Sequence, residues 1–354
     1  MILEGKSILV IGGTGSMGQV LVRRLLGGEL GAPRRVIVFS RDEAKQHTMR
    51  IAHLDRRAST DEVIYDDFRD ALEFRIGDVR SYGDVCSAVK DADVVVNAAA
   101  LKQVPTCEYF PAQAVDTNCN GPANIVRAIR EHDWPVETVI GISTDKACKP
   151  VNVMGMSKAI QERILIAANI SNPKTRFVCV RYGNVLASRG SVIPLFRDQV
   201  LSGGPVTLTH PEMTRFLLSI DDAVDTVFEA LRSARRGETY VPIVESATVS
   251  NIALALVGER DVRIRHVGVR PGEKMHEILV SEEECRHVAR RGDYYAILPM
   301  LPELHDTETP LHELEREYSS ADSVLDLEQT AALLTEHGLM LDASSVRATS
   351  ELLR

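Results

Sequence analysis

The sequence predicts an α/β fold, in which a doubly wound parallel sheet is followed by a smaller C-terminal α/β domain. Two observations support this prediction. Short apolar runs of strand length alternate with helix-period stretches through the first half of the chain, and that order requires crossover connections between parallel strands. The runs at 8–11, 36–39 and 94–96 are apolar throughout, as strands covered by helices on both faces must be.

The first domain is expected over residues 1–185, with some later segments returning to it. Its predicted strands are 7–11, 36–39, 72–76, 94–98, 138–142 and 176–182. Its predicted helices are 18–26, 84–89, 112–131 and 153–168. In the third helix apolar residues recur near every third or fourth position, which indicates one buried face.

After residue 185 the pattern becomes less regular, and Gly/Pro turns are more frequent. The elements expected there are helices at 192–201 and 221–233 and strands at 239–243 and 263–267. This predicts a second, smaller domain over residues 186–305. Residues 306–354 are rich in Glu, Leu and Ser, and we expect them to form a C-terminal helical extension.

The composition excludes several classes of function. The 354 residues carry a net charge of −9 and are 44% hydrophobic, which is typical of a folded soluble protein and disfavours non-specific binding to nucleic acid or anionic membranes. No apolar run reaches the ~18 residues of a membrane span, and the N-terminus lacks signal-peptide features. The six cysteines form no CxxC pair and the ten histidines show no ligand spacing, so we expect a reduced, cytoplasmic protein without a metal site.

A glycine-rich loop follows the first strand and opens the next helix. In its spacing Gly12 permits a tight turn, Gly15 lets the backbone approach a pyrophosphate, and Gly18 lets helix and strand pack closely. The strand before and the helix after are the context that this motif needs, whereas a P-loop would continue with Lys-Ser or Lys-Thr. The loop therefore predicts a Rossmann-like dinucleotide site; the alternative is a glycine-rich turn without a ligand. The expected contacts are Gly12, Thr14, Gly15, Ser16, Met17 and Gly18.

The residues after the second and third predicted strands indicate which dinucleotide the protein binds. An acid at the end of the second strand would bind the ribose diol of NAD, whereas a small residue followed by Arg suits the 2′-phosphate of NADP. Ser40 and Arg41 stand there, so we expect NADP, with NAD as the alternative. The alternative is that Arg41 only pairs with Asp42 or Glu43 on the surface. Asp78 follows the third strand and would accept a hydrogen bond from the adenine amino group or cap the next helix.

An acid and a lysine follow the strand at 138–142, at the end where open α/β sheets bind ligands. Asp145 and Lys146 are therefore a candidate proton-transfer pair, and the alternative is a surface ion pair. Further on, Met154 and Lys158 are four residues apart and share one helix face. Many short-chain dehydrogenases have Tyr and Lys at this spacing. Because methionine cannot transfer a proton, the protein is either inactive or uses another group.

Eight ordered blocks carry a family resemblance. They are Gly-Gly-Thr-Gly-Ser-Met-Gly (12–18), Ser-Arg-Asp-Glu (40–43), Ala-Ala-Ala-Leu-Lys-Gln-Val-Pro (98–105), Ser-Thr-Asp-Lys-Ala (143–147), Arg-Tyr-Gly-Asn-Val (181–185), Gly-Ser-Val-Ile-Pro (190–194), Met-Thr-Arg-Phe (213–216) and Arg-Pro-Gly-Glu-Lys (270–274). Together they resemble the UDP-N-acetylglucosamine 4,6-dehydratases, a polysaccharide-biosynthesis branch of the extended short-chain dehydrogenase/reductase superfamily. The similarity covers about residues 5–279. Met in place of Tyr occurs in part of that branch, notably in large membrane-anchored members.

The resemblance implies a redox-neutral dehydration. The sugar is oxidised at C4, loses water across C5 and C6, and is reduced at C6 with the same tightly bound, recycled cofactor. Lys146 would be the base at C5, Asp145 the acid for the C6 hydroxyl, and Thr144 a hydrogen-bond partner near C4. Lys158 would orient the nicotinamide ribose. With Met154 in place of tyrosine, we assign the C4 hydroxyl proton to Asp145, directly or through water.

The resemblance also implies binding residues. Asn184 would bind the substrate diphosphate, Lys102 would meet the substrate or the nicotinamide, and Arg270 and Glu273 would reach phosphate and ribose from the second domain. The remaining expected contacts are Val192 for the substrate and Val79, Ala98 and Ala100 for the cofactor. Cys148 lies beside the acid–lysine pair, but no His or second Cys supports a nucleophile, so we expect it only to pack.

Other functions stay open at this point. The first alternative is a 4-epimerase, which usually retains the tyrosine, or a dehydratase for another sugar nucleotide. The second is a non-catalytic NADP-binding protein. The expected partners are a UDP-sugar and further copies of the chain in a homo-oligomer, not nucleic acid or membrane. Because two anionic nucleotides must bind, we expect one cleft to gather Arg41, Lys102, Lys146, Lys158 and Arg270.

Overall fold

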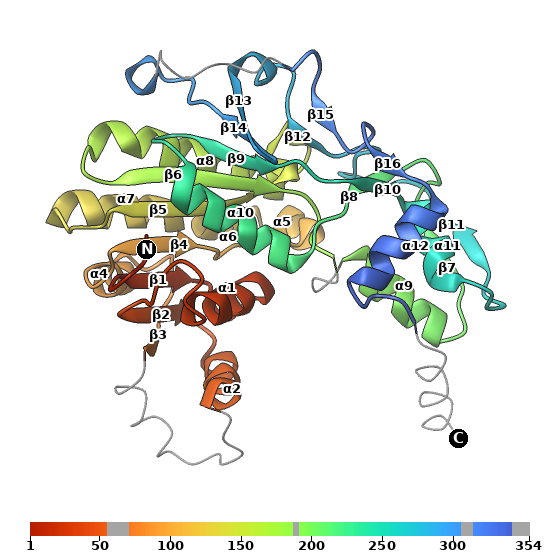
Figure 1. Cartoon of the computed structure of the whole chain (residues 1–354), viewed down its shortest axis with the longest axis horizontal. Coiled ribbons are helices and arrows are strands. Elements are labelled where there is room, and N and C mark those ends of the chain that lie inside the picture. Colours follow the sequence, from red (N-terminus) through yellow and green to blue (C-terminus); the bar gives the residue numbers. More distant parts are fainter. Residues whose placement is uncertain (55–70, 187–190, 306–313, 342–354) are drawn as a thin grey trace.

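The computed structural model describes residues 1–54, 71–186, 191–305 and 314–341 (Figure 1). Its largest sheet within these ranges has nine strands in the order β13-β14-β9-β6-β5-β4-β1-β2-β3. The parallel strands are β1 (Ser7–Ile11), β2 (Arg35–Ser40), β3 (Leu72–Ile76), β4 (Val94–Asn97), β5 (Thr138–Thr144), β6 (Arg176–Tyr182) and β9 (Thr239–Pro242). The antiparallel edge strands are β13 (Val288–Arg291) and β14 (Tyr294–Ile297). The predicted doubly wound α/β fold is confirmed.

Both faces of the sheet are covered by helices, which explains the continuously apolar strands. Along β1, Ile8 and Val10 pack into one hydrophobic cluster and Leu9 and Ile11 into another, because successive side chains point to opposite faces. The first cluster includes α1 (Ser16–Leu26) and α10 (Ile220–Ser233); the second includes α4 (Tyr82–Val89), α7 (Gly121–His132) and α8 (Val153–Ser171). Helix α2 (Glu43–Leu54) follows β2.

One predicted helix is interrupted. The stretch expected as a single helix over 112–131 consists of α6 (Pro111–Val115), a π-helical turn η2 (Asp116–Asn120) and α7, and it is preceded by α5 (Val104–Tyr109). Pro122 explains the break, because it has no N–H to donate to the carbonyl four residues earlier. Gly121 instead donates to the Asp116 carbonyl, which closes the wider turn.

The chain enters a second group of elements after β6 and returns to the large sheet through α10, β9, β13 and β14. The second group contains β8 (Thr214–Phe216), β10 (Ser246–Thr248), β7 (Val206–Leu208), β11 (Ile264–His266), β12 (Ile278–Val280), α9 (Val192–Leu201) and α11 (Val249–Val257). A separate hydrophobic cluster is formed by residues of α9, α11, β7, β10 and β11. The apolar residues of β8 and β12 belong to another cluster, which also contains residues of β9, β13 and β14. Segments of the second half therefore return to the first domain.

The C-terminal residues 314–341 are not an all-helical extension. They contain β15 (Tyr318–Ser319), which pairs with β12, β16 (Val324–Leu325), which pairs with β10, and α12 (Leu327–Glu336). Leu334 and Leu341 are buried in the cluster that α9 and α11 also form. This part of the chain is thus integrated into the second group of elements, and the other expected residues of the extension lie outside the described residues.

Candidate active site

The glycine-rich loop between β1 and α1 has the geometry that its spacing predicts. Gly12 has a φ of +79°, and a Cβ there would lie 2.7 Å from the backbone nitrogen of Ala99. A Cβ on Gly18 would lie 2.6 Å from the Cα of Gly13. At the exposed Gly15 the nearest atom to such a Cβ is the Gly12 carbonyl oxygen at 3.3 Å. Gly12 and Gly18 therefore shape the turn, whereas Gly15 leaves its surface open.

The N-terminus of α1 suits an anion. Gly15 is the N-cap residue and has no side chain with which to cap the helix, and the first turn holds no acidic residue. Free N–H groups and the helix dipole at such an end favour a phosphate. Thr14 is buried, and Ser16 and Met17 are half-buried. The loop thus fits the pyrophosphate of the dinucleotide that the sequence predicts.

The residues expected at the adenosine end lie on neighbouring strand ends. Ser40 ends β2, and the exposed side chain of Arg41 places its NH1 3.9 Å from the carboxylate of Asp78. Arg80 donates to Asp78 from Nε (3.0 Å) and NH2 (2.6 Å), and these bonds lower the pKa of Asp78. The cap of α4 is Ser81, not Asp78, so that alternative is wrong. The contact of Asp78 with adenine stays a prediction.

The acid–lysine pair follows β5 in the short 3-10 turn Asp145–Ala147. Asp145 is fully buried, and its Oδ1 accepts hydrogen bonds from Thr144 Oγ1 (2.7 Å) and Lys146 Nζ (3.1 Å). Its Oδ2 is buried and has no partner among the residues that the structure describes. The side chain of Lys146 is 22% exposed. The surface ion-pair interpretation is therefore wrong, because the acid has no contact with solvent.

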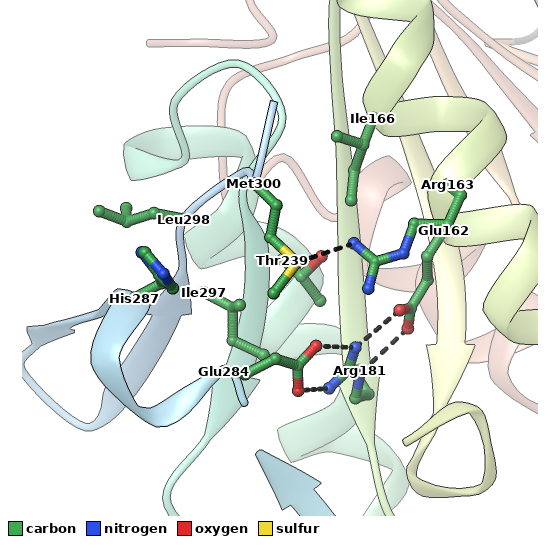
Figure 2. A pocket seen from close by; sticks show the side chains of 10 residues that line it. All are labelled: Glu162, Arg163, Ile166, Arg181, Thr239, Glu284, His287, Ile297, Leu298 and Met300. Carbon is green, nitrogen blue, oxygen red and sulfur yellow. Dashed lines mark hydrogen bonds and ion pairs between the residues drawn. The ribbon is translucent and has the colours of Figure 1, made fainter. Parts of the chain in front are cut away.

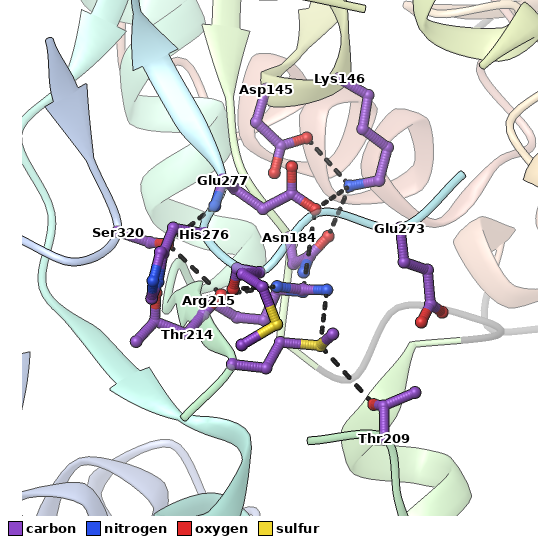
Figure 3. Close-up of polar contacts among 12 residues, drawn as sticks. Asp145, Lys146, Asn184, Thr209, Thr214, Arg215, Glu273, His276, Glu277 and Ser320 are labelled. Atoms are coloured by element: carbon purple, nitrogen blue, oxygen red, sulfur yellow. Dashed lines mark hydrogen bonds and ion pairs between the residues drawn. The ribbon is translucent and has the colours of Figure 1, made fainter. Parts of the chain in front are cut away.

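Two further elements bring polar groups to Lys146 (Figure 3). Its Nζ lies 3.2 Å from Asn184 Oδ1, after β6, and 3.5 Å from Glu277 Oε1, just before β12. Arg215 on β8 places its Nε 3.8 Å from the same oxygen of Glu277. Sequence reasoning missed both Glu277 and Arg215. Arg215 lies in the Met-Thr-Arg-Phe block and was visible there, whereas Glu277 belongs to no block.

The charges around Lys146 keep it protonated. Burial opposes the ammonium form, but the carboxylates of Asp145 and Glu277 outweigh that effect and raise the Lys146 pKa above its usual value. Arg215 acts in the opposite direction. In the resting protein Lys146 is therefore an ammonium, and it must lose a proton before it can act as a base.

Met154 and Lys158 have separate surroundings although they share α8. Met154 is buried with Cys107 and Ala114 in a small apolar cluster that α5 and α6 form. The ammonium of Lys158 donates to the Ile142 carbonyl (2.5 Å) and to Gln161 Oε1 (2.6 Å). Burial lowers the Lys158 pKa to about 8. Met154 therefore packs, while Lys158 lies against the strand that ends at the acid–lysine pair.

A buried ion network lies beneath this strand end (Figure 2). Arg181 on β6 donates to both oxygens of Glu162 on α8 (3.0 and 2.7 Å) and to both oxygens of Glu284 (2.7 and 2.9 Å). It also donates to the Leu279 carbonyl on β12 (2.9 Å). Ser143, two residues before Asp145, donates to Glu162 (2.5 Å). The network ties α8, β5 and β6 to the segment that carries Glu277.

The other predicted site residues are distributed as follows. Lys102 is exposed after β4, and the exposed Arg270 donates its backbone N–H to Glu273 Oε2 (3.3 Å). Val192 is the first residue of α9 and packs partly into the second-domain core. Val79 is buried against Gly121. Ala98 donates its N–H to the Ile11 carbonyl, and Ala100 is exposed. Their contacts with ligands stay predictions.

The five cations expected at one cleft lie on segments at one edge of the sheet. Arg41, Lys102 and Lys146 follow the carboxyl ends of β2, β4 and β5, and Lys158 binds the Ile142 carbonyl of β5. The loop that carries Arg270 reaches this edge because the Gly272 carbonyl accepts a hydrogen bond from Asn152, the N-cap of α8 (3.0 Å). That they line one shared cleft stays a prediction.

Cys148 is buried, and burial raises its thiol pKa to about 12, which agrees with a packing role. In the described parts of the chain, no group of three or more His, Cys, Asp or Glu side chains is placed to hold a metal ion. No helix within the described ranges is long and apolar enough to cross a membrane.

The fold and the site define an α/β protein of the short-chain dehydrogenase/reductase type, with a dinucleotide loop and an acid–lysine pair at the end of β5. A family model described as "Polysaccharide biosynthesis protein" matches residues 8–299. The chain belongs to this polysaccharide biosynthesis protein family. It is related to nucleotide-sugar-modifying enzymes.

Relatives and solved structures carry both activities in their names. Proteins named "UDP-glucose 4-epimerase" from Rickettsia bellii (strain OSU 85-389) and Rickettsia canadensis (strain McKiel) are 43% and 42% identical, each over 82% of both chains. The structure of Pen from Bacillus thuringiensis aligns with a TM-score of 0.84 at 30% identity, over 96% of this chain and 100% of that one. The dTDP-glucose 4,6-dehydratase DesIV from Streptomyces venezuelae, solved with NAD, has a TM-score of 0.63 at 22% identity, over 76% and 86%. At 22% identity, the similarity to DesIV shows the fold alone.

Proposed function

We propose that the chain is a UDP-N-acetylglucosamine 4,6-dehydratase that forms a UDP-4-keto-6-deoxy-N-acetylhexosamine. The observation that carries the proposal is the pair of buried Asp145 and partly buried Lys146 at the carboxyl end of β5, combined with Met154 in place of a tyrosine. Elimination of water from C5 and C6 needs a base and an acid side by side. An aspartate and a lysine 3.1 Å apart supply both.

The proton steps balance with these two groups. A bound nicotinamide, for which we favour NADP because of Arg41, supplies the hydride exchange. Asp145 takes the proton of the C4 hydroxyl and later gives it to the C6 hydroxyl, which leaves as water. Lys146 first releases its ammonium proton to solvent. The neutral amine then takes the C5 proton once the C4 ketone has acidified it, and returns a proton to C5 after reduction at C6. Thr144 hydrogen-bonds near C4, and both catalytic groups end in the forms in which they entered the reaction.

A second candidate is a 4-epimerase, which the names of the Rickettsia relatives favour. An epimerase removes and returns the C4 hydrogen on opposite faces, and needs one group that handles the C4 hydroxyl proton. It has no use for a separate base at C5. The acid–lysine pair and the buried Met154 therefore support dehydration over epimerisation.

One incubation separates these functions. With UDP-N-acetylglucosamine, a dehydratase gives a product lighter by one water, an epimerase gives an isomer of unchanged mass, and a non-catalytic protein gives neither. Proton NMR of the product in D2O would also show deuterium at C5, because the proposed base exchanges its proton with solvent. UDP-glucose serves as the parallel substrate.

Asp145→Asn tests the acid. The amide keeps the size of the side chain but cannot transfer the proton, so turnover should fall at least ~100-fold while the cofactor stays bound. Cofactor retention is measured by absorbance after gel filtration. Turnover close to wild type in a variant that holds cofactor would refute the assignment.

A further inference from the structure

Resting on the function proposed above, we propose that Glu277 is a positioning residue, which fixes the orientation of Lys146 and sets its proton affinity. The second domain would thereby control the base of the first. The argument uses the placement of Glu277, the shared contacts of Lys146 and the opposing charge of Arg215.

Glu277 is held tightly where it meets Lys146. Its N–H donates to Ser320 Oγ (2.9 Å), and its carbonyl accepts from the Ser320 N–H (2.8 Å). The side chain is 4% exposed, and Oε1 lies 3.5 Å from Lys146 Nζ. Its other oxygen, Oε2, is buried without a hydrogen-bond partner among the described residues. A carboxylate buried in this way is costly, and a cation nearby offsets that cost.

The Lys146 ammonium contacts three oxygens from three different segments. Asp145 Oδ1 lies at 3.1 Å, Asn184 Oδ1 at 3.2 Å and Glu277 Oε1 at 3.5 Å. The contacts with Asp145 and Asn184 are hydrogen bonds and the contact with Glu277 is an ion pair, so the three oxygens together hold the ammonium in one position. Without Glu277 one of these contacts would be lost, and the amine would be free to turn away from Asp145.

The same contacts determine the charge of Lys146. The charged groups that face it are Asp145 from its own turn, Glu277 from the segment before β12, and Arg215 from β8; Asn184 is neutral. Glu277 favours the ammonium, and Arg215 disfavours it by competing for Glu277. Removal of Glu277 should thus raise the fraction of neutral Lys146 at a given pH, and removal of Arg215 should lower it.

The variants Glu277→Gln and Arg215→Gln test the proposal in opposite directions. Glu282→Gln is the control, because it removes an exposed carboxylate from the same segment. Acetylation by acetic anhydride near pH 9 measures the neutral amine, and peptide mass spectrometry gives the ratio of labelling at Lys146 to labelling at the exposed Lys174. Glu277→Gln should raise this ratio roughly tenfold or more, Arg215→Gln should lower it, and Glu282→Gln should leave it unchanged.

Activity provides the second measurement. The rising limb of the pH–rate profile, which reports loss of a proton from Lys146, should move to lower pH by roughly one pH unit or more in Glu277→Gln. The proposal would be overturned if the labelling ratio is unchanged in folded Glu277→Gln, or if it moves in the same direction in Glu277→Gln and Arg215→Gln. If Glu277→Gln does not fold, the decrease expected for Arg215→Gln decides. If the labelling shifts as expected but wild type leaves UDP-N-acetylglucosamine intact, the proposed function fails and the role of Glu277 stands.

Discussion

The substitution Lys158→Met tests how much free energy the protein spends on a buried charge near its site. The Lys158 side chain is buried, and burial lowers its pKa from the usual 10.5 to about 8. At pH 7 this lowering of the pKa corresponds to a penalty of about 3 kcal/mol in the free energy of folding, because the buried side chain carries a charge. Methionine has nearly the same length and carries no charge, so it removes this penalty together with the two hydrogen bonds of the ammonium.

The stability of the wild-type protein should depend on pH in a definite direction. Because the Lys158 pKa is lower in the folded chain, the unfolded chain binds more protons between pH 8 and 10.5, and wild-type stability rises across this window. The penalty of about 3 kcal/mol at pH 7 falls to about 1 kcal/mol at pH 9.5. The free energy of unfolding of Lys158→Met, relative to wild type, should therefore decrease by about 2 kcal/mol between these pH values.

Urea unfolding at both pH values, without added nucleotide, measures this change. The lost hydrogen bonds shift the variant by a similar amount at each pH, so they do not affect the comparison. Lys174→Met is the control, because the Lys174 side chain is 75% exposed and its charge stays in water. If the free energies of unfolding of Lys158→Met and wild type differ by the same amount at pH 7 and at pH 9.5, the reasoning is refuted.

Three further predictions concern the network, the loop and the nucleotide. Arg181→Met leaves two buried carboxylates without their cation and should lower the free energy of unfolding by about 3–5 kcal/mol in urea titrations; a loss below ~1 kcal/mol would contradict a buried pair. Gly12→Ala should lower stability by at least about 2 kcal/mol, because φ is +79° and the new Cβ meets backbone, whereas Gly15→Ala should melt near wild type yet bind NADP more weakly in calorimetry. Arg41→Ala should weaken NADP binding at least ~10-fold and leave NAD binding nearly unchanged; equal losses for both would exclude contact with the 2′-phosphate.

The parts of the fold that could be predicted depend on local patterns. The strand β1 and the loop after it are readable because four apolar residues, Ile8 to Ile11, precede a glycine spacing that only a turn into a helix requires. The acid–lysine pair is readable for a similar reason, since it directly follows a buried strand. Pro122 is the local signal for the break, but the helical period of the surrounding residues predicts one continuous helix over 112–131.

Glu277 could not be predicted from such patterns. It lies more than a hundred residues after Lys146, in a short segment without helical or strand periodicity. Its contact with Lys146 depends on how elements far apart in the sequence pack together. The Arg181 network could not be predicted for the same reason, because Glu162 and Glu284 come from separate elements whose contact is not visible in a single sequence. Charged residues in buried positions are rare, and no local rule distinguishes them from those on the surface.

The return of the chain to the central sheet has a consequence for the integrity of the molecule. Strand β9 pairs with β6, and α10 packs on the same layer as α1, although the second group of elements separates them in sequence. The two halves are therefore joined by strand pairing and helix packing as well as by peptide bonds. A protease cut between β6 and α10 should leave two fragments that stay associated without denaturant, so neither half is an independent module that can be expressed alone.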